Sequence, residues 1–310
     1  MKRLYVKLLI ALMLPLKSFC QNERLDTIKV FFLGGQSNMA GFGKSIDLPV
    51  SSNSEINSIW IFHGNAAKDN RKNGGLGKWE ILKPGHGSLF QSNADTNILS
   101  GLFGAELSFG MEMKSFYPNE KIALIKYAKG GSSLDRKAIV SKVAGTWDPK
   151  YKRGKGINQY THFLKTVSNA LKEKDINGDG KEDYLVPSGI VWMQGESDAI
   201  QLKTALGYKE NLKGIMGLIR NTFNSPNLPI VIGLISDSKQ HEKRKIWKHG
   251  EIIQNAQKEF VIEDKNAILV ESTLNYNYSD KYHYDTEGYI DLGKEFAIAI
   301  LKLLSSPTQK

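Results

Sequence analysis

The chain has a single cysteine, Cys20, among its 310 residues. One thiol cannot form an intramolecular disulfide, and zinc or iron–sulfur sites built from thiolates need several cysteines. The apolar run at Leu8–Leu16 is too short to span a bilayer as a helix. Hydrophobic residues make up 41% of the chain and charged residues 24%, which is ordinary globular usage. The composition therefore excludes a disulfide framework, a disordered chain and a multi-span membrane protein.

Positive charge is in excess, with a formal net charge of +10. Four basic residues lie in the first twenty positions, which contain no acidic residue. Two further basic clusters, at 150–155 and 243–248, have no recognisable nucleic-acid module around them. We expect a solvated basic surface, with weak attraction to an anionic polymer as the alternative. No nucleic-acid partner is predicted.

The first twenty residues have the pattern of a secretory signal peptide, with a basic start before the apolar run. Cleavage after Cys20 would place Ser18 at the −3 position and start the mature chain at Gln21. A lipid anchor on Cys20 is a second interpretation, which the bulky Phe19 disfavours. A buried N-terminal helix is a third, which the flanking charges and Pro15 disfavour. We predict export to the periplasm or the extracellular space, without stable membrane insertion.

Short apolar runs alternate with amphipathic stretches along the rest of the chain. We expect strands at 28–33, 59–62, 121–128, 189–193, 228–235 and 267–270, and helices at 102–116, 160–174, 206–223, 245–262 and 286–304. Continuously apolar strands that alternate with helices indicate a parallel sheet covered by helices on both faces. Because we find no repeat and no interdomain linker, we predict one α/β domain over residues 25–305.

Polar, mostly glycine-rich segments follow three of these strands, and a fourth polar segment lies near the C-terminal end. They are residues 34–41, 129–133, 194–198 and 279–285. In open α/β sheets, ligands bind beyond the carboxyl ends of the strands. We therefore expect the four segments to converge on one edge of the sheet.

Ser37 follows a strand and a Gly-Gly turn, where a helix start would offer N–H groups to an oxyanion. A serine nucleophile needs a base, and the base needs an orienting acceptor. Asp280 and His283 offer both within four residues. The Gly-x-Ser-x-Gly elbow of α/β-hydrolases is absent, because position 39 is Met39. Each signal alone is typical of a turn or a surface loop, and their combination at strand ends indicates a serine hydrolase.

Four motifs occur in a fixed order along the chain. They are GQSNMAG at 35–41, KGGSSL at 129–134, WMQGESD at 192–198, and Asp280-x-x-His283. This set resembles that of the sialate O-acetylesterase and carbohydrate esterase family six group of the SGNH (GDSL-like) hydrolase superfamily. The resemblance covers about residues 28 to 300. It implies a flavodoxin-like, three-layer α/β/α fold with a central parallel sheet of about five strands.

The resemblance also implies roles for individual residues. Ser37 would be the nucleophile, His283 the base and Asp280 its orienting carboxylate. The oxyanion hole would be formed by the N–H groups of Ser37 and Gly131 and the side-chain amide of Gln194. The glutamine replaces an asparagine of the wider superfamily, as in the esterase subgroup.

Glu196 has two interpretations, as has the nearby Asp198. Each carboxylate would either orient the base or contact a substrate hydroxyl, or would be buried and tie the backbone amides of the site loops together. For Glu196 we expect the supporting, structural role, because one carboxylate already serves His283. His86 lies in a glycine-rich loop and is a candidate for lining the substrate cleft. The other histidines lack a His-x-x-x-His spacing, so no catalytic metal or other catalytic cofactor is predicted.

Residues 175–183 follow the spacing of a calcium-binding loop. Oxygen-bearing side chains occupy positions 1, 3, 5 and 9, glycine occupies position 6, and Val186 stands where an EF-hand has its bidentate glutamate. The spacing resembles the shorter calcium loops of extracellular proteins. The candidate ligands are Asp175, Asn177, Asp179, Lys181 and Asp183. Both a structural calcium ion and a polar turn without metal fit this sequence.

The sequence therefore predicts an exported serine esterase that removes O-acetyl groups from a carbohydrate, such as a xylan-type polysaccharide or sialic acid. One alternative is an SGNH hydrolase that acts on lipid or aryl esters. Another is a non-catalytic carbohydrate-binding protein with the same fold. We expect substrate specificity in the loops at 63–100 and 135–156, which carry no recognisable motif.

Overall fold

A computed structural model of the protein describes residues 26–49, 55–152, 156–241 and 244–305. The predicted signal peptide, residues 1–20, lies outside the described residues. The helices of the described part are all too short or too polar to cross a membrane.

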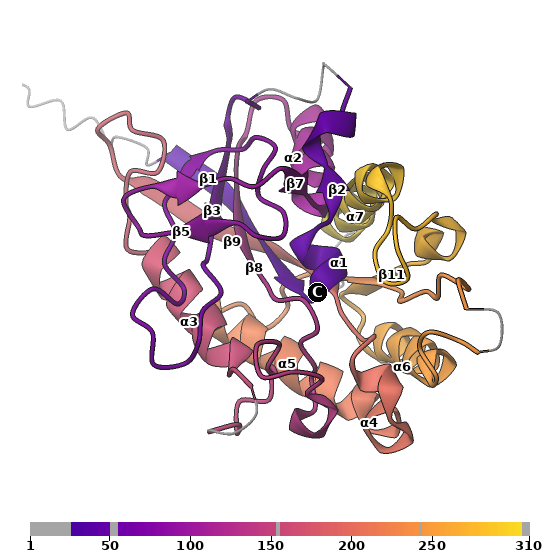
Figure 1. Ribbon diagram of the computed structural model, residues 1–310. Coiled ribbons are helices and arrows are strands. Elements are labelled where there is room, and N and C mark those ends of the chain that lie inside the picture. Colours follow the sequence, from indigo (N-terminus) through magenta and orange to yellow (C-terminus); the bar gives the residue numbers. More distant parts are fainter. Residues whose placement is uncertain (1–25, 50–54, 153–155, 242–243, 306–310) are drawn as a thin grey trace, which may run out of the picture.

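A seven-stranded sheet forms the centre of the fold (Figure 1). Its strands run in the order β11 (Ala267–Val270), β10 (Ile230–Gly233), β9 (Asp183–Met193), β1 (Asp26–Gly35), β8 (Lys121–Ala128), β3 (Ile59–His63) and β4 (Glu80–Ile81). The first six are parallel, and β4 pairs with β3 in the antiparallel direction. All six apolar runs that we expected to be strands lie in this sheet. The sheet is larger than the five or so strands that the resemblance implied.

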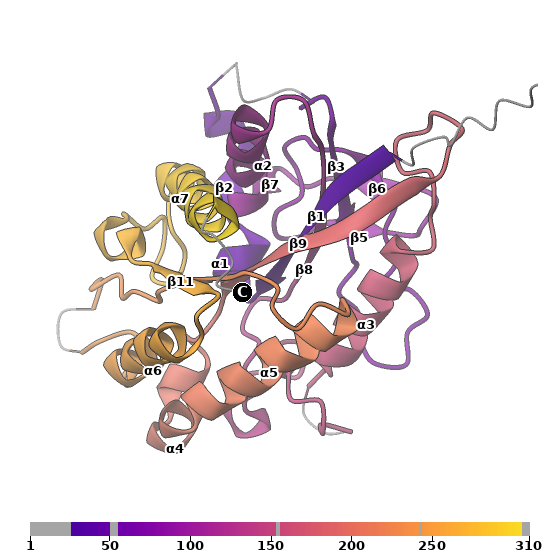
Figure 2. The same ribbon diagram turned by 180° about the vertical axis from the view of Figure 1, so that it is seen from behind.

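Helices cover both faces of this sheet (Figures 1 and 2). On one face lie α2 (Ala105–Phe116) and α7 (Thr286–Ser305), and on the other lie α3 (Gln159–Ala170), α5 (Tyr208–Thr222) and α6 (Gly250–Glu263). The short helix α4 (Leu202–Leu206) contacts α5 and α6. Two small ribbons, β2 (Gly43–Lys44) with β7 (Leu102–Phe103) and β5 (Gln91–Ser92) with β6 (Asn97–Ile98), lie outside the sheet. The predicted three-layer α/β/α arrangement is confirmed.

Two predicted helices are interrupted at glycines. In the segment 102–116, the first two residues form β7, and the helix starts only after Gly104, whose N–H donates to Glu106 Oε1 at 2.8 Å. The predicted helix at 206–223 is divided at Gly207 into α4 and α5. Glycine is accepted at helix ends but is unfavourable inside helices.

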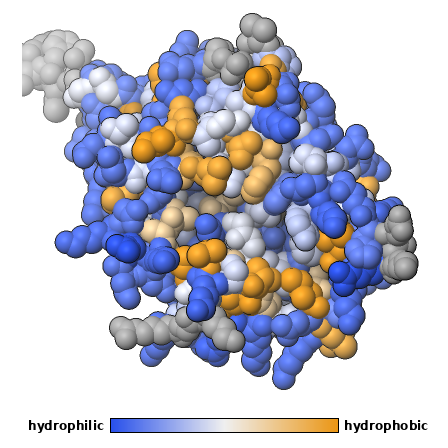
Figure 3. All heavy atoms as spheres, viewed as in Figure 1, coloured by the Kyte–Doolittle hydropathy of each residue, from blue (hydrophilic) through white to orange (hydrophobic). Residues whose placement is uncertain are grey.

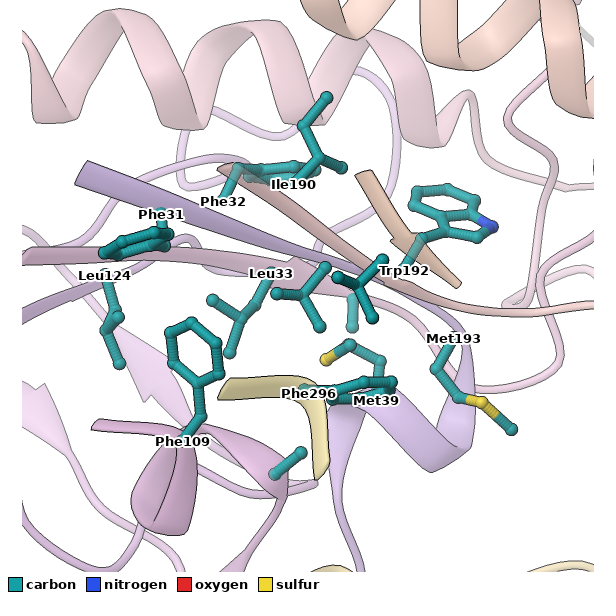
Figure 4. Packing of buried hydrophobic residues seen from close by; sticks show 14 of the residues in the cluster. Phe31, Phe32, Leu33, Met39, Phe109, Leu124, Ile190, Trp192, Met193 and Phe296 are labelled. Atoms are coloured by element: carbon teal, nitrogen blue, oxygen red, sulfur yellow. The ribbon is translucent and has the colours of Figure 1, made fainter. Parts of the chain in front are cut away.

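Both faces of the central strand β1 are buried against aromatic side chains (Figure 4). Phe31 points toward Phe109 of α2, with ring centroids 5.4 Å apart. Its neighbour Phe32 points to the opposite face and meets Phe163 of α3 at 4.8 Å. Alternation along a strand places successive side chains on opposite faces. The strand is therefore packed on both sides up to the residues that lead into the site.

Candidate active site

The three central strands end at the same level. Gly35, at the end of β1, is paired with Ala128 of β8 and with Met193 of β9. The polar segments that follow these strands, which contain Ser37, Lys129 and Gln194, therefore leave the sheet together, beside the short helix α1 (Ser37–Ala40; Figure 1). The predicted convergence of these segments is confirmed.

Gly35 allows the end of β1 to lie this close to the end of β9. Its φ is +146°, and a Cβ atom there would lie 2.0 Å from the carbonyl oxygen of Met193. The next residue, Gln36, donates its N–H to the same oxygen at 2.9 Å. Only glycine allows such a close backbone approach, so this position fixes where α1 begins.

Ser37 is the first residue of α1 and is 8% exposed. An N–H group in the first turn of a helix has no acceptor within that helix. Gly130 lies directly against Ser37, because a Cβ atom on Gly130 would be 3.5 Å from Ser37 Cβ. The nearest side chains to the corresponding position on Gly131 are those of Ala144 and Val140, both at 3.2 Å. From the sequence we did not expect Gly130 in the site. Because Gly130 lies against Ser37, its N–H is a second candidate donor to an oxyanion, in addition to the N–H of Ser37.

Asp280 holds His283 and the turn that carries it. Asp280 Oδ2 lies 2.8 Å from His283 Nδ1. Asp280 Oδ1 accepts the N–H groups of Tyr282 at 2.7 Å and of His283 at 2.9 Å. Partial burial opposes the charge on Asp280, but these hydrogen bonds outweigh it and lower the pKa of the carboxyl. The imidazole ring stacks on Phe42, with centroids 3.7 Å apart, and its Nδ1 is held by the carboxylate.

Asn38 joins the serine helix to the histidine turn. Its side chain is 2% exposed, and Nδ2 donates to the carbonyl oxygen of Tyr282 at 3.2 Å. Asn38 directly follows Ser37, and Tyr282 directly precedes His283. The two parts of the proposed catalytic group are thus fixed to each other by a neighbour of each. Sequence reasoning missed Asn38, although it lies inside the first motif.

Glu196 supports this connection from behind. Its side chain is 1% exposed, and Oε1 accepts Asn38 Nδ2 at 2.9 Å, while Tyr289 donates its hydroxyl to Asn38 Oδ1 at 2.8 Å. Burial raises the pKa of Glu196, although hydrogen bonds that include the one from Asn38 oppose the shift. Besides the Asn38 amide, the backbone N–H groups of Gly195 and of Glu196 itself oppose the shift, so the carboxylate contacts the loop backbone, as we expected, as well as an amide side chain. This geometry places Glu196 in a supporting position.

Gln194 is fully buried between the loops. Its Nε2 lies within hydrogen-bond distance of three acceptors, which are Asp198 Oδ2 at 2.8 Å, Ser132 O at 3.1 Å and Gln36 Oε1 at 3.2 Å. Its Oε1 accepts the hydroxyl of Tyr208 at 3.1 Å. An amide nitrogen has two hydrogens to donate. To donate to an oxyanion, the Gln194 amide must therefore break at least one of its hydrogen bonds to these acceptors.

Asp198 connects the second and third motifs. Its two oxygens accept the N–H groups of Leu134 and Asp135, both at 2.9 Å, in addition to the amide of Gln194. Burial raises the pKa of Asp198 to about 7, against the opposing effect of these donors. Of the two interpretations of Asp198, the contacts fit the structural one.

A buried ion pair lies beneath α1. Lys126 Nζ is 2.6 Å from Glu106 Oε2, and both residues are 0% exposed. The same ammonium group donates to the carbonyl oxygens of Ala40 at 3.0 Å and His86 at 2.7 Å. Burial lowers the pKa of Lys126, while Glu106 opposes that shift. Lys126 thereby holds the last residue of α1 and the glycine-rich loop against the sheet.

His86 does not line the cleft, so this expectation was wrong. The residue is 0% exposed, its ring packs beside Phe90, and burial together with Lys126 lowers its pKa to about 3. The glycine-rich sequence around His86 indicated that this residue is exposed. The hydrogen bond from Lys126 Nζ to the carbonyl oxygen of His86 instead holds the residue inside the protein. Its neighbours Gly87 and Ser88 line the cleft instead.

The loop at 175–183 is closed by hydrogen bonds from its own backbone. Asp175 accepts the N–H groups of residues 178, 179 and 180 at 2.8–3.1 Å. Asn177 donates its amide to Asp183 Oδ1 at 2.7 Å, and Asp179 Oδ1 accepts the N–H of Lys181 at 3.0 Å. In the described ranges, no group of three or more histidine, cysteine, aspartate or glutamate side chains is arranged to hold a metal ion. Calcium binding stays a prediction.

Residues 27–302 match the family model of proteins described as carbohydrate esterase, sialic acid-specific acetylesterase. A probable carbohydrate esterase of Arabidopsis thaliana is 23% identical over 282 residues, which cover 88% of this chain and 90% of that protein.

Solved structures share the fold at low sequence identity. The X-ray structure of the Arabidopsis thaliana protein aligns with a TM-score of 0.59 at 22% identity, covering 88% of this chain and 98% of that one. A carbohydrate acetylesterase from Xanthomonas citri aligns with a TM-score of 0.59 at 15% identity, covering 88% of this chain and 56% of that one. NanS aligns with a TM-score of 0.57 at 16% identity, covering 90% and 98%.

Proposed function

This chain belongs to the family of carbohydrate esterases described as sialic acid-specific acetylesterases, and we propose that it removes O-acetyl groups from a carbohydrate with Ser37 as the nucleophile. Family membership makes it a carboxylic ester hydrolase. The observation that carries the proposal is that the segment with Ser37, at the carboxyl end of β1, is joined to the Asp280–His283 turn. That turn is tied to the residue after the serine by the bond from Asn38 to Tyr282.

His283 serves as the general base. Because Asp280 holds Nδ1, the other ring nitrogen, Nε2, is the atom that accepts the Ser37 hydroxyl proton. The lowered pKa of Asp280 keeps its carboxylate ionised, so it stabilises the imidazolium ion that forms. Asp280 orients the ring and does not itself take up the proton.

The reaction proceeds through an acetyl-enzyme. Ser37 Oγ attacks the acetyl carbonyl carbon, the bond from that carbon to the sugar oxygen breaks, and His283 gives its proton to the leaving hydroxyl. Water then attacks the acetyl group, His283 takes one of its protons, and acetate leaves as that proton returns to Ser37. The N–H groups of Ser37 and Gly131 and the amide of Gln194 hold the negatively charged oxygen, with Gly130 as a further donor.

Export follows from the N-terminal segment. The basic start and the short apolar run support cleavage after Cys20 and release of the domain at residues 25–305 to the periplasm or the exterior. Cell fractionation with N-terminal sequencing of the mature protein tests this part. Protein found in the cytoplasm with residues 1–20 still attached would contradict the proposed export.

Acetate release tests the proposed activity. The purified domain is given O-acetylated sialic acid, acetylated xylan and a long-chain lipid ester, and Ser37→Ala is compared with wild type and with the control Ser225→Ala. We expect release from at least one acetylated sugar, and a loss on the order of 10⁴-fold or more for Ser37→Ala at unchanged circular dichroism. Faster hydrolysis of the lipid ester would favour a lipase-like activity, and glycan binding without turnover would favour a binding protein.

A further inference from the structure

The aromatic ring of Phe42 covers one face of the imidazole of His283. The two ring centroids are 3.7 Å apart, and the planes are inclined by only 13°. Two uncharged aromatic rings prefer an offset or edge-to-face arrangement with centroids about 4.5–7 Å apart. The face of a phenyl ring carries negative partial charge and attracts a cation placed over it. The observed geometry therefore suits the imidazolium form of His283 better than the neutral form.

Glycines on both sides fix the backbone that carries Phe42. Gly41 has a φ of +94°, and a Cβ atom there would lie 2.3 Å from the Cα atom of Gly104. Gly43 is paired with Phe103 between β2 and β7, and a Cβ atom on it would lie 2.8 Å from the Phe103 ring. Only glycine allows such close approaches. The segment that carries Phe42 therefore lies directly on the chain at residues 103–104.

Helix α7 holds the same segment from a second side. The backbone N–H of Phe42 forms a hydrogen bond to the Tyr289 hydroxyl, which itself donates to Asn38 Oδ1 at 2.8 Å. Two residues further on, Lys44 donates its N–H to Thr286 Oγ1 at 3.1 Å. Figures 1 and 2 show β2 beside α7. Because its backbone is held at these points, Phe42 offers His283 a fixed surface.

The imidazole of His283 thus has a carboxylate at its edge and an aromatic ring on its face. The titratable side chains around it are Asp280, Lys281 and Tyr282 on its own turn, with Glu196 behind Asn38 and Tyr289 on α7. The segment 37–43 contributes no charged side chain. On the face that bears α1, hydrophobic residues gather near the centre and hydrophilic ones border much of it (Figure 3). Attraction between a cation and an aromatic face is stronger where water is excluded.

A second stack in the protein lacks this charge. Phe90 lies on His63 with centroids 4.0 Å apart and an angle of 12° between the planes. His63 is buried, and burial together with Lys126 lowers its pKa well below the usual value, so it stays neutral. His283 differs because Asp280 Oδ2 lies 2.8 Å from its Nδ1. An aromatic face can act on charge only where the neighbouring ring takes up a proton.

We propose that Phe42 is a positioning residue of the esterase, which holds the imidazole of His283 in place and stabilises the imidazolium ion that forms when Nε2 takes the Ser37 proton. The proposal rests on the proposed function. The resting base is neutral and gains little from the aromatic face, whereas the protonated base of the transition state gains more. Only an interaction that is stronger in the transition state than in the ground state raises kcat. The stack therefore contributes to the rate of acyl transfer rather than to substrate affinity.

A titration of His283 by NMR tests the contact without relying on activity. It is carried out in the Ser37→Ala protein, with Phe42→Leu and with pentafluorophenylalanine at position 42. Leucine removes the aromatic face, whereas the fluorinated ring keeps its shape and loses the negative charge of its face. We expect the titration midpoint of His283 to move to lower pH by about 0.3–1 unit in Phe42→Leu, which is a two- to tenfold change. The fluorinated ring should move the midpoint at least as far.

The kinetic test restores Ser37 and uses 4-nitrophenyl acetate. Both changes at position 42 should lower kcat at high pH roughly two- to tenfold, leave KM unchanged, and move the acid limb to lower pH. The matched control is the same pair of changes at Phe116, a partly buried ring at the last residue of α2, before β8 begins. The control should keep the midpoint and kcat of the wild type. If Phe42→Leu does not fold, the fluorinated ring still tests the charge.

An unchanged midpoint and kcat with the fluorinated ring would overturn the proposal, even if Phe42→Leu were impaired, because the ring would then act by shape alone. Equal shifts in the Phe116 variants would overturn it as well. A shifted midpoint in a protein without esterase activity refutes only the proposed function. An active esterase with an unshifted midpoint refutes only the role of Phe42.

Discussion

Replacing Glu196 by alanine tests whether the serine helix and the histidine turn are held together through Asn38. Glu196 Oε1 accepts Asn38 Nδ2 at 2.9 Å, and the same amide donates to Tyr282 O at 3.2 Å, next to His283. Without the carboxylate, the Asn38 side chain loses one of its fixed partners. We therefore expect the turn that carries the base to lose its alignment with Ser37.

The size of the effect follows from burial. Asn38 is 2% exposed and Glu196 is 1% exposed, so the amide hydrogen left without a partner cannot turn to water. An unsatisfied buried polar group costs about 1–3 kcal/mol of stability. Misplacing a reacting group by about 1 Å costs roughly 10²-fold in rate. Glu196→Gln keeps an acceptor for Asn38, and the raised pKa of Glu196 reduces the cost of a neutral amide, so this variant should stay close to wild type.

The assay is a double-mutant cycle of Asn38→Ala and Glu196→Ala. Acetate release gives kcat/KM, and urea denaturation gives the free energy of unfolding. Because the two side chains act as a unit, we expect a coupling energy of about 0.5–3 kcal/mol and a double variant little worse than either single one. The acid limb of the pH–rate profile should keep its position in Glu196→Ala, since Asp280 still holds His283.

Additive losses would refute the connection through Asn38. A second outcome would also refute it: Glu196→Gln loses as much kcat/KM as Glu196→Ala, and the acid limb of its pH–rate profile is displaced. Glu196 would then act as a second carboxylate for the base.

Three further predictions concern stability. Glu106→Gln leaves Lys126 buried without a carboxylate, so urea denaturation should show that the free energy of unfolding falls by about 3–5 kcal/mol. The control Glu271→Gln breaks the exposed pair with Lys258 and should lower it by less than about 1 kcal/mol. Equal losses in the two variants would contradict this prediction. Asp198, with a pKa of about 7 when folded, keeps a proton that the unfolded chain loses near pH 4. The free energy of unfolding should therefore fall from about pH 4 to 7 and level off above, and Asp198→Asn should lose this part of the pH dependence. EDTA should lower the melting temperature and added calcium should restore it, while an unchanged melting curve without bound calcium would remove the metal from the loop at 175–183.

The sheet could be predicted because its strands are continuously apolar. The run at 28–33 is buried on both faces apart from the partly exposed Lys29, and its apolar pattern can be recognised without knowing which strands lie beside it. The first half of β9 was missed, since residues 183–188 are partly polar and include Pro187. The edge strand β4 is only two residues long, so its sequence carries no recognisable strand pattern. It becomes a strand only because it pairs with β3.

The site could be predicted only where a motif names the chemistry. Ser37, Asp280 and His283 are residue types that acyl transfer requires, and the contact from Asp280 to His283 spans three residues. The role of Asn38 depends on a contact across 244 positions, which no local pattern encodes. Gly130 against Ser37 and the burial of His86 likewise depend on how strands that are distant in sequence end together.

Labelling with a fluorophosphonate, followed by peptide mass spectrometry, tests the central claim most directly. The reagent attaches to a serine that a neighbouring base has activated. We predict one adduct on Ser37 that blocks acetate release, no adduct in Ser37→Ala, and strongly reduced labelling in His283→Ala. An adduct on another residue that blocks the activity, or acetate release that survives complete labelling of Ser37, would contradict the account.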